Sequence, residues 1–197
     1  YYLSQGGSLV RTNQRLGGGR GIQPRAPRGE TYRFNWSSPF IISPHNSQVV
    51  YFGGNRLFRS VDRGANFRPI SPDLTTNDPR KLRAGEGSVT PEQTTAENHC
   101  TLITIDESPM TPGLVWTGSD DGLVHVSRDD GKTWVNVTRN IPDLPANTWV
   151  SRVIASKFVE GRAYATFDGH RDNDYRTYVY TTEDFGKTWK KIVERGA

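Results

Sequence analysis

The sequence lacks the residues that mark several common classes of protein. It contains a single cysteine, Cys100, so an internal disulfide is impossible and we expect a partly buried free thiol. No stretch approaches a run of about 18 apolar residues, the length of a membrane-spanning helix. No basic segment followed by an apolar one marks a signal peptide at Tyr1. These absences exclude a disulfide framework and a helical membrane span.

The residues that are abundant favour a turn-rich globular domain. The chain has 197 residues, enough to bury a core, and 11% of them are aromatic, too many for a disordered chain. Its 20 glycines and 12 prolines suit an all-β protein better than a helical one. The net charge of +4 is uneven, because residues 1–33 contain six arginines and one acid, Glu30. The basic character therefore belongs to one segment.

A short motif occurs three times along the chain. Residues 60–67 (SVDRGANF), 127–134 (SRDDGKTW) and 182–189 (TEDFGKTW) all fit Ser/Thr-x-Asp-x-Gly-x-x-aromatic. Each follows two short β-rich runs around a glycine-containing turn, with a third apolar run earlier and a fourth run afterwards. Four short antiparallel strands in each repeat predict one blade of a β-propeller. We therefore expect an all-β propeller fold with three complete four-stranded blades and one partial blade.

The repeats also predict how the chain is divided. The expected units are a partial blade with a basic Gly/Arg-rich loop at 1–33, a blade at 34–71, an inter-blade loop at 72–98, a blade at 99–138 and a blade at 139–197. In the partial blade, residues 1–13 resemble a middle hairpin and IQPRAP (22–27) its outer edge, with no innermost strand. A helical turn is expected near Pro91–Glu97.

Each residue type that the three motifs share has a structural use in a turn between the third and fourth strands. The aspartate can accept from a backbone N–H two residues on, the glycine supplies a positive φ, the Ser/Thr hydroxyl bonds across the turn, and the aromatic ring is buried. A calcium loop would need more oxygen ligands and a terminal glutamate. We interpret the motif as structural rather than metal-binding or catalytic. Its residues are Ser60, Asp62, Gly64, Phe67, Ser127, Asp129, Gly131, Trp134, Thr182, Asp184, Gly186 and Trp189.

This motif resembles the Asp-box, or BNR repeat, of sialidases, sortilin-type receptors and family 74 xyloglucanases. The stretches at 71–79 (SPDLTTNDP), 96–109 (AENHCTLITIDESP) and 147–156 (NTWVSRVIAS) resemble bacterial sortilin-like or glycosyl-hydrolase-like BNR-repeat proteins. The resemblance implies a segment of a longer chain in an extracytoplasmic setting, secreted, periplasmic or in the outer envelope. It also implies that the rest of a larger propeller, or neighbouring subunits, covers the open edges, and that Asp-boxes lie away from the ligand face.

Two polar stretches are candidates for ligand binding. DGHRDND (168–174) lies in the expected turn between the second and third strands of the last blade, and ENH (97–99) precedes an innermost strand. Such groups can hydrogen-bond a glycan or a peptide, although turn capping is the competing interpretation. The candidate residues are Glu97, His99, Asp168, His170, Arg171 and Asp172.

No metal, cofactor or catalytic centre is predicted. The four histidines, His45, His99, His125 and His170, form no HxH or HExxH spacing. A glycosidase needs two carboxylates about 5–10 Å apart. Acids are available, but no sequence feature pairs any two of them; they are Asp106, Glu107, Asp120, Asp121, Asp168 and Asp172. The turn-like stretches DESP (106–109) and GSDDG (118–122) receive no function.

The segment RLGGGRGIQPRAPRG (15–29) resembles an Arg/Gly-rich nucleic-acid tail, but it lacks interleaved aromatic residues. We interpret it as a loop, with an anionic protein or lipid contact and nucleic acid as open alternatives. The hypothesis for the whole chain is a non-catalytic propeller module for protein or glycan binding, or for scaffolding. The alternative is part of a glycoside hydrolase-like enzyme whose acids lie partly in missing blades.

Overall fold

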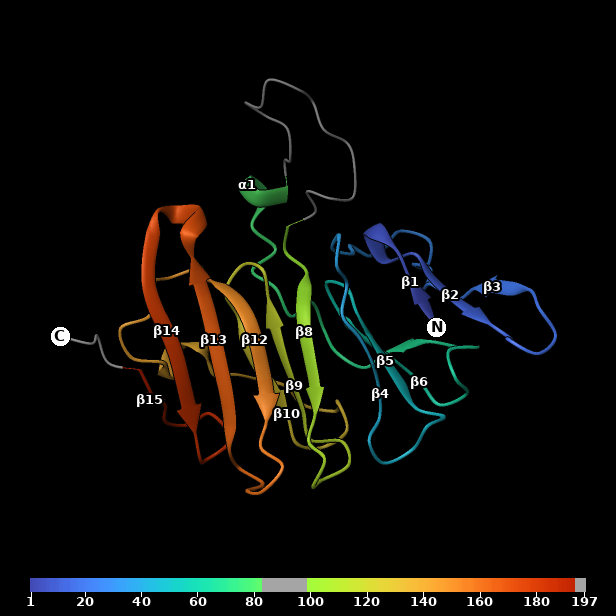
Figure 1. The fold of residues 1–197 in the computed structure, drawn as a ribbon. Helices are drawn as coiled ribbons and strands as arrows, with labels where there is room; N and C mark the ends of the chain where they lie inside the picture. The colour runs from blue at the N-terminus through green and yellow to red at the C-terminus, as the bar shows by residue number, and fades with distance from the viewer. Residues whose placement is uncertain (83–98, 194–197) are drawn as a thin grey trace.

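The computed structural model describes residues 1–82 and 99–193, and these form four antiparallel sheets in chain order (Figure 1). The first sheet contains β1 (Tyr2–Leu3), β2 (Leu9–Thr12) and β3 (Gly19–Gly21). The second contains β4 (Phe40–Ile42), β5 (Val50–Gly53), β6 (Leu57–Ser60) and β7 (Arg68–Pro69). The third contains β8 (Leu102–Glu107), β9 (Val115–Ser119), β10 (Val124–Ser127) and β11 (Val135–Asn136). The fourth contains β12 (Trp149–Ala155), β13 (Ala163–Gly169), β14 (Asp174–Thr182) and β15 (Lys190–Lys191).

Helical structure is confined to the connections. Helix α1 (Pro79–Leu82) follows the second sheet, and 3₁₀ turns η1 (Gln5–Gly7), η3 (Thr138–Asn140) and η4 (His170–Asp172) join strands or sheets. None of the helices in the described residues has the length and apolar character needed to cross a bilayer. The expected turn near Pro91–Glu97 lies outside the described residues, and α1 lies earlier in the same connection.

The two middle sheets are covered on both faces, and their central strands show it. All residues of β5 and β9 are buried, so these strands read as continuous apolar or small-residue runs. Strand β13 instead alternates between buried and more exposed residues, as expected for a sheet with one covered face. The burial pattern thus reports the position of each sheet in the stack.

The hydrophobic core lies between successive sheets rather than within any one of them. One cluster joins the first and second sheets, including Leu9 and Phe52. A second joins the second and third sheets, including Tyr51 and Leu102. The largest joins the third and fourth sheets, where the rings of Trp116 and Trp189 meet edge to face with centroids 6.1 Å apart. Each sheet is therefore stabilised mainly by its neighbours.

One aromatic position shows which face of the last sheet is open. Tyr51, Trp116 and Tyr164 occupy equivalent places, each next to the residue that pairs with the first residue of the motif. The side chains of Tyr51 and Trp116 are 0% exposed because the next sheet covers them, whereas Tyr164 is 39% exposed. The fourth sheet thus presents the face that the following sheet covers in the second and third.

The predicted all-β antiparallel fold is confirmed, with one correction in the first sheet. The hairpin expected in residues 1–13 is present as β1 and β2, but its outer neighbour is β3 at Gly19–Gly21 rather than IQPRAP at 22–27. Two prolines, Pro24 and Pro27, remove the N–H groups that a strand would donate. Only Ile22 of that stretch is buried in the core.

Candidate functional site

The three repeated motifs form the turns between the third and fourth strands of sheets two, three and four, as predicted. In the turn at 127–134, the Ser127 hydroxyl accepts from the N–H of Gly131 at 2.9 Å and donates to Asp129 at 3.0 Å. Asp129 accepts from the N–H and hydroxyl of Thr133 at 2.9 and 2.6 Å. The other two turns have equivalent bonds, with the side-chain amide of Asn66 donating to Asp62 in place of a hydroxyl.

One detail of the predicted turn is wrong. The aspartate accepts from the N–H four residues on, as Asp62 does from Asn66, and not from the N–H two residues on. The reason is that two successive residues, Arg63 and Gly64, both have positive φ values of 59° and 82°, which widens the turn. Hydrogen bonds to the Asp62 carboxylate lower its pKa to about 2, and the bond from Ser60 has the largest effect, followed by those from Asn66. The acid is therefore an ionised acceptor within its own turn.

Each motif also docks its sheet onto the preceding one. A Cβ on Gly131 would lie 2.8 Å from the carbonyl oxygen of Ile70, which directly follows β7, so only glycine allows this approach. The indole Nε1 of Trp134 donates to the same carbonyl at 2.9 Å. Gly64 and Gly186 approach side chains instead, since a Cβ would lie 2.5 Å from Cδ1 of Ile22 and 2.8 Å from Cβ of Val137, respectively. The motif is thus a contact between sheets as well as a turn.

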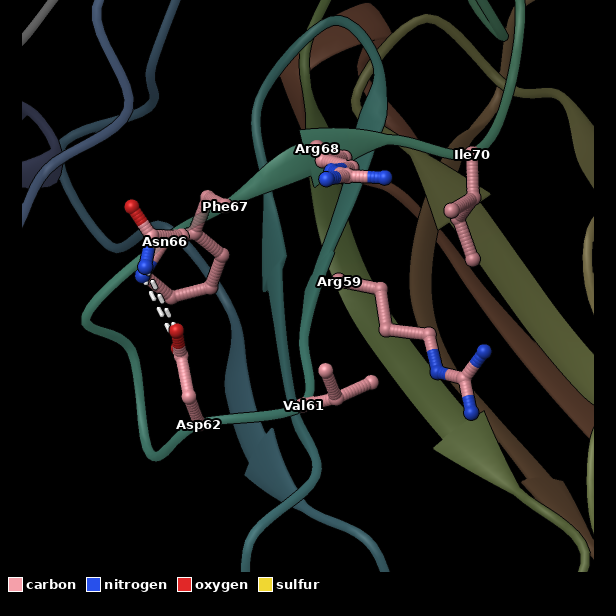
Figure 2. Close-up of a pocket in the computed structure, with 7 residues that line it drawn as sticks. All are labelled: Arg59, Val61, Asp62, Asn66, Phe67, Arg68 and Ile70. Atoms are coloured by element: carbon pink, nitrogen blue, oxygen red, sulfur yellow. Dashed lines mark hydrogen bonds between the residues drawn. The ribbon is translucent and has the colours of Figure 1, made fainter.

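A hollow of about 520 Å³ lies beside the first of these turns (Figure 2). Its lining residues are Arg59, Val61, Asp62, Asn66, Phe67, Arg68 and Ile70. Asp62 is occupied by Asn66, and Arg59 extends to Asp130 of the third sheet at 2.6 Å. Asp62 and Arg59 of this hollow are therefore already engaged by other groups of the protein.

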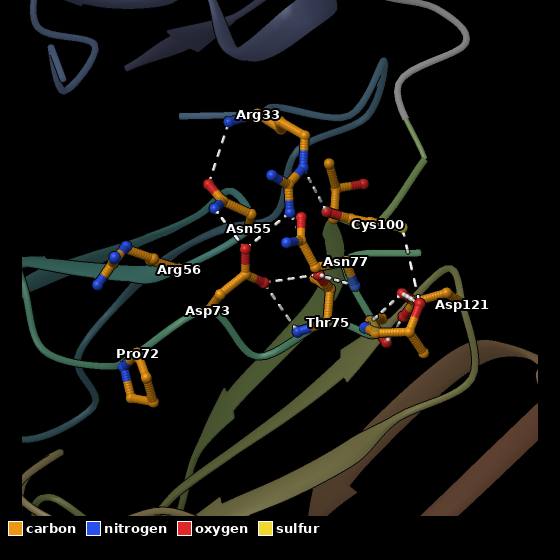
Figure 3. A network of polar contacts seen from close by, with 12 residues as sticks. Arg33, Asn55, Arg56, Pro72, Asp73, Thr75, Asn77, Cys100 and Asp121 are labelled. Atoms are coloured by element: carbon orange, nitrogen blue, oxygen red, sulfur yellow. Dashed lines mark hydrogen bonds and ion pairs between the residues drawn. The ribbon is translucent and has the colours of Figure 1, made fainter. Parts of the chain in front are cut away.

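The end of the sheets opposite the Asp-box turns carries α1 and the β13–β14 turn, and it is called here the α1 end (Figure 1). Arg33 donates to Asp73 at 2.7 Å and to the carbonyl of Cys100 at 3.2 Å (Figure 3). Asn55 and Thr75 also donate to Asp73, at 2.8 and 2.6 Å. This network ties the approach to the second sheet to the connection that leaves it.

The turn at 118–122 is more than a solvated hairpin tip. Asp120 and Asp121 are buried, and Asp120 accepts from the N–H and hydroxyl of Thr101 and from Asn35 at 2.7–3.2 Å. Asp121 accepts from the N–H and hydroxyl of Thr76, both at 2.7 Å. Burial raises the pKa of Asp120. Sequence reasoning missed this role because its partners come from distant segments.

The candidate residues of the β13–β14 turn are brought together, with His170 and Arg171 exposed and Asp168 half-buried. Asp168 Oδ2 lies 2.6 Å from Nδ1 of His170 and 3.9 Å from the Arg171 guanidinium, which lies over the ring of Trp149 at 4.0 Å. The hydrogen bond from the backbone N–H of His170 lowers the pKa of Asp168, and the hydrogen bond from the His170 ring lowers it further by a smaller amount. Asp172 is exposed in the same turn. This cluster offers a carboxylate, an imidazole and a cation to solvent.

The second candidate stretch is only partly described. Glu97 lies outside the described residues, and His99 is half-buried just before Cys100. Cys100 is fully buried rather than partly buried, and burial raises the pKa of its thiol to about 11. It has a φ of 59° and lies just before β8, outside any strand.

The described residues show no group of three or more acid, histidine or cysteine side chains that could hold a metal. Two of the acids considered for catalysis, Glu107 and Asp106, are engaged by other groups of the protein. Tyr51 donates to Glu107 at 3.0 Å, a phenol–carboxylate pair, but both residues are buried and burial raises the Tyr51 pKa. Asp106 accepts from the N–H of Ala155 at 2.7 Å. These acids stabilise the fold.

A family model of the BNR-Asp box repeat matches residues 179–192, which contain the whole of the third motif. No curated protein matches the chain. Three solved structures are similar. The GH74 xyloglucanase from Xanthomonas campestris has 18% sequence identity and a TM-score of 0.50, and the match covers 78% of this chain and 22% of that chain. The GH74 enzyme from Niastella koreensis has 17% identity and a TM-score of 0.50, and the match covers 83% of this chain and 22% of that chain. YCF48 from Cyanidioschyzon merolae has 18% identity and a TM-score of 0.51, and the match covers 85% of this chain and 42% of that chain.

These likenesses show the fold, a β-propeller built from BNR repeats. The chain spans 22% of the length of either xyloglucanase and 42% of YCF48. The four sheets are therefore equivalent to a part of each of those proteins. At these identities the likeness carries no catalytic residue from one chain to another.

Proposed function

We propose that the chain is a non-catalytic propeller module that binds a protein or glycan through its α1 end. The observation that carries the proposal is the exposed cluster of Asp168, His170 and Arg171 on the β13–β14 turn. The carboxylates at the other end of the sheets are occupied by their own turns. The proposed setting is extracytoplasmic, and the proposed relationship is to sortilin-like BNR-repeat proteins.

The chemistry of the cluster suits polar partners. Asp168 accepts hydrogen bonds, Arg171 donates several in a fixed plane, and Trp149 supplies an aromatic surface under the guanidinium. Hydroxyl groups of a glycan or polar side chains of a protein loop would match these groups. Because the cluster is exposed, it needs no movement of the sheets to meet a ligand.

A scaffolding role follows from the open face of the fourth sheet. Tyr164 is equivalent to two residues that a following sheet covers, so we propose a further sheet with an Asp-box as the partner of this face. That sheet belongs either to the rest of a larger propeller or to a neighbouring subunit. The binding cluster and the docking face would then lie on one sheet.

The alternative function is part of a carbohydrate-active enzyme. The likeness in fold to two GH74 structures favours it, and its acids would lie partly in blades that this chain does not include. In the described residues, the acids of the candidate cluster are Asp168, which is half-buried, and Asp172, which is exposed. Asp168 is held by His170, which suits recognition better than proton transfer to a leaving group.

The test is a binding titration by calorimetry with xyloglucan oligosaccharides and with a panel of peptides. We expect binding that is lost in the double variant Asp168→Asn/Arg171→Gln. The matched control is Lys157→Gln, an exposed charge at the other end of β12. Equal affinity of the double variant and the wild-type protein for every bound ligand would contradict the proposed site.

A further inference from the structure

Two sheets contain arginines directly opposite one another on neighbouring strands. Arg11 pairs with Arg20 across β2 and β3, and Arg59 pairs with Arg68 across β6 and β7. Like charges in directly opposed positions destabilise a sheet unless an opposite charge compensates them. The two pairs occupy equivalent positions, on the last two strands of each sheet, so their surroundings can be compared directly.

The second sheet has its compensating charge. Nη1 of Arg59 lies 2.6 Å from Oδ2 of Asp130, which the Asp-box of the third sheet supplies. Asp130 has a φ of 62° and directly precedes the glycine of that motif. An aspartate held on a turn at this position therefore meets the arginine of the preceding sheet.

The arginine pair of the first sheet lacks a compensating negative charge of this kind within the described residues. Arg11 reaches the same position of the next Asp-box, but the residue there is Arg63, with a φ of 59°. Nη1 of Arg11 donates to the carbonyl oxygens of Arg63 at 2.9 Å and Asp62 at 3.4 Å, and no side-chain carboxylate meets it within the described residues. The contact between the first and second sheets thus has an arginine on each side, Arg11 and Arg63, where the contact between the second and third sheets has an ion pair.

A wide pocket of about 910 Å³ opens at this contact. Arg11, Arg15, Arg20 and Arg63 line it, and none of its lining residues is acidic. In the described part of the chain, none of the four forms an ion pair. The turn beside it is open, because a Cβ on Gly18 would meet nothing within 4 Å.

We propose that this pocket, called here the arginine pocket, binds an aspartate or glutamate side chain on an acidic segment of a partner protein. The Arg59–Asp130 pair is the internal example of such recognition, at the equivalent position of the next sheet. Guanidinium groups bind carboxylates with paired N–H donors, so four of them favour a segment with several acids. The site lies at the end opposite the β13–β14 turn and is independent of the function proposed above.

A nucleic acid fits the pocket less well. Single strands bind to basic grooves that also offer aromatic rings for stacking. Tyr1 is the one aromatic residue of the lining, and its hydroxyl donates to the carbonyl of Arg63 at 3.0 Å. The acidic residues of a protein segment need no such platform, so the lining favours a peptide.

The experiment measures fluorescence anisotropy of a labelled hexa-aspartate peptide at low salt, with hexa-asparagine as the uncharged control peptide. The double variant Arg15→Gln/Arg20→Gln should weaken binding at least about tenfold. The control double variant Arg25→Gln/Arg28→Gln removes the same charge from exposed sites outside the pocket and should weaken it less than about twofold. Equal losses in both would show a long-range charge effect and overturn the site.

A second variant tests the mechanism without depending on those two side chains. Arg63→Asp places a carboxylate at the position of Asp130, and aspartate tolerates a positive φ. We expect it to abolish peptide binding and to raise the midpoint of thermal unfolding. No binding of hexa-aspartate to the wild-type chain would overturn the proposal, as would binding of inorganic phosphate or a sulfated oligosaccharide with which the peptide fails to compete.

Discussion

Arg59 of the second sheet and Asp130 of the third form an ion pair at 2.6 Å, and Asp130 is the residue before the glycine of an Asp-box. Arg11 and Arg128 reach the equivalent residues, Arg63 and Phe185, of the next box along the chain. The Arg128 guanidinium lies 3.8 Å from the centroid of the Phe185 ring. The residue before the glycine of each Asp-box therefore meets an arginine of the preceding sheet, through its carbonyl, its carboxylate or its aromatic ring, although Arg59 directly precedes its own box and Arg128 lies within one.

The strength of the charged contact is modest, because the side chains of Arg59 and Asp130 are 26% and 44% exposed. A double-mutant cycle with Arg59→Gln and Asp130→Asn should give a coupling energy of about 0.5–1 kcal/mol in denaturant unfolding. Asparagine keeps the positive φ at position 130. The coupling should fall at high salt. A coupling of zero at low salt would show that the pair contributes nothing to docking.

The glycine of the third-sheet Asp-box should be needed for packing as well as for its φ. Gly131→Ala would place a Cβ 2.8 Å from the carbonyl oxygen of Ile70, whereas Gly17→Ala, also at positive φ, would meet nothing within 4 Å. The Gly17 change should cost about 1 kcal/mol of backbone strain. The Gly131 change should cost about 1–3 kcal/mol more in free energy of unfolding. Equal losses would remove the argument that the box docks one sheet onto another.

The Asp-boxes should make the fold sensitive to acid. Hydrogen bonds from Ser60 and Asn66 lower the pKa of Asp62 from 3.8 to about 2, so ionised Asp62 stabilises the folded state. That stability is fully present above the unfolded pKa and is lost as the pH falls through about 4 towards about 2. The difference in unfolding midpoint between wild-type protein and Asp62→Asn should shrink over this interval. A difference that stays constant down to the lowest pH would contradict this assignment.

The open face of the fourth sheet predicts unequal costs at equivalent aromatic positions. Trp116→Ala removes a fully buried ring and should cost about 3–5 kcal/mol of unfolding free energy. Tyr164→Ala should cost less than about 1 kcal/mol, because no sheet covers that ring. A large loss at Tyr164 in the isolated chain would show that this face is covered, for example by a second copy, and sedimentation would then reveal the dimer.

The sequence was sufficient to predict features that depend on local bonds. The Asp-box closes within eight residues, so its hydroxyl, carboxylate and glycine identify the turn wherever they occur. The residue before the glycine was missed, because arginine, aspartate and phenylalanine all occupy it and only the preceding sheet gives it a partner. The buried pair at Asp120 and Asp121 resembled an ordinary turn, since its donors at Asn35, Thr76 and Thr101 come from other segments.

The central claim is that the carboxylates of these sheets hold the fold and the chain binds without catalysis. The most direct test measures the release of reducing ends from xyloglucan and other oligosaccharides, on this chain and on any longer polypeptide that contains it. We predict no release above that of heat-denatured protein, under conditions where the calorimetric titration detects binding. Release that disappears in Asp120→Asn or Asp168→Asn would contradict the claim and establish the enzyme as the correct alternative.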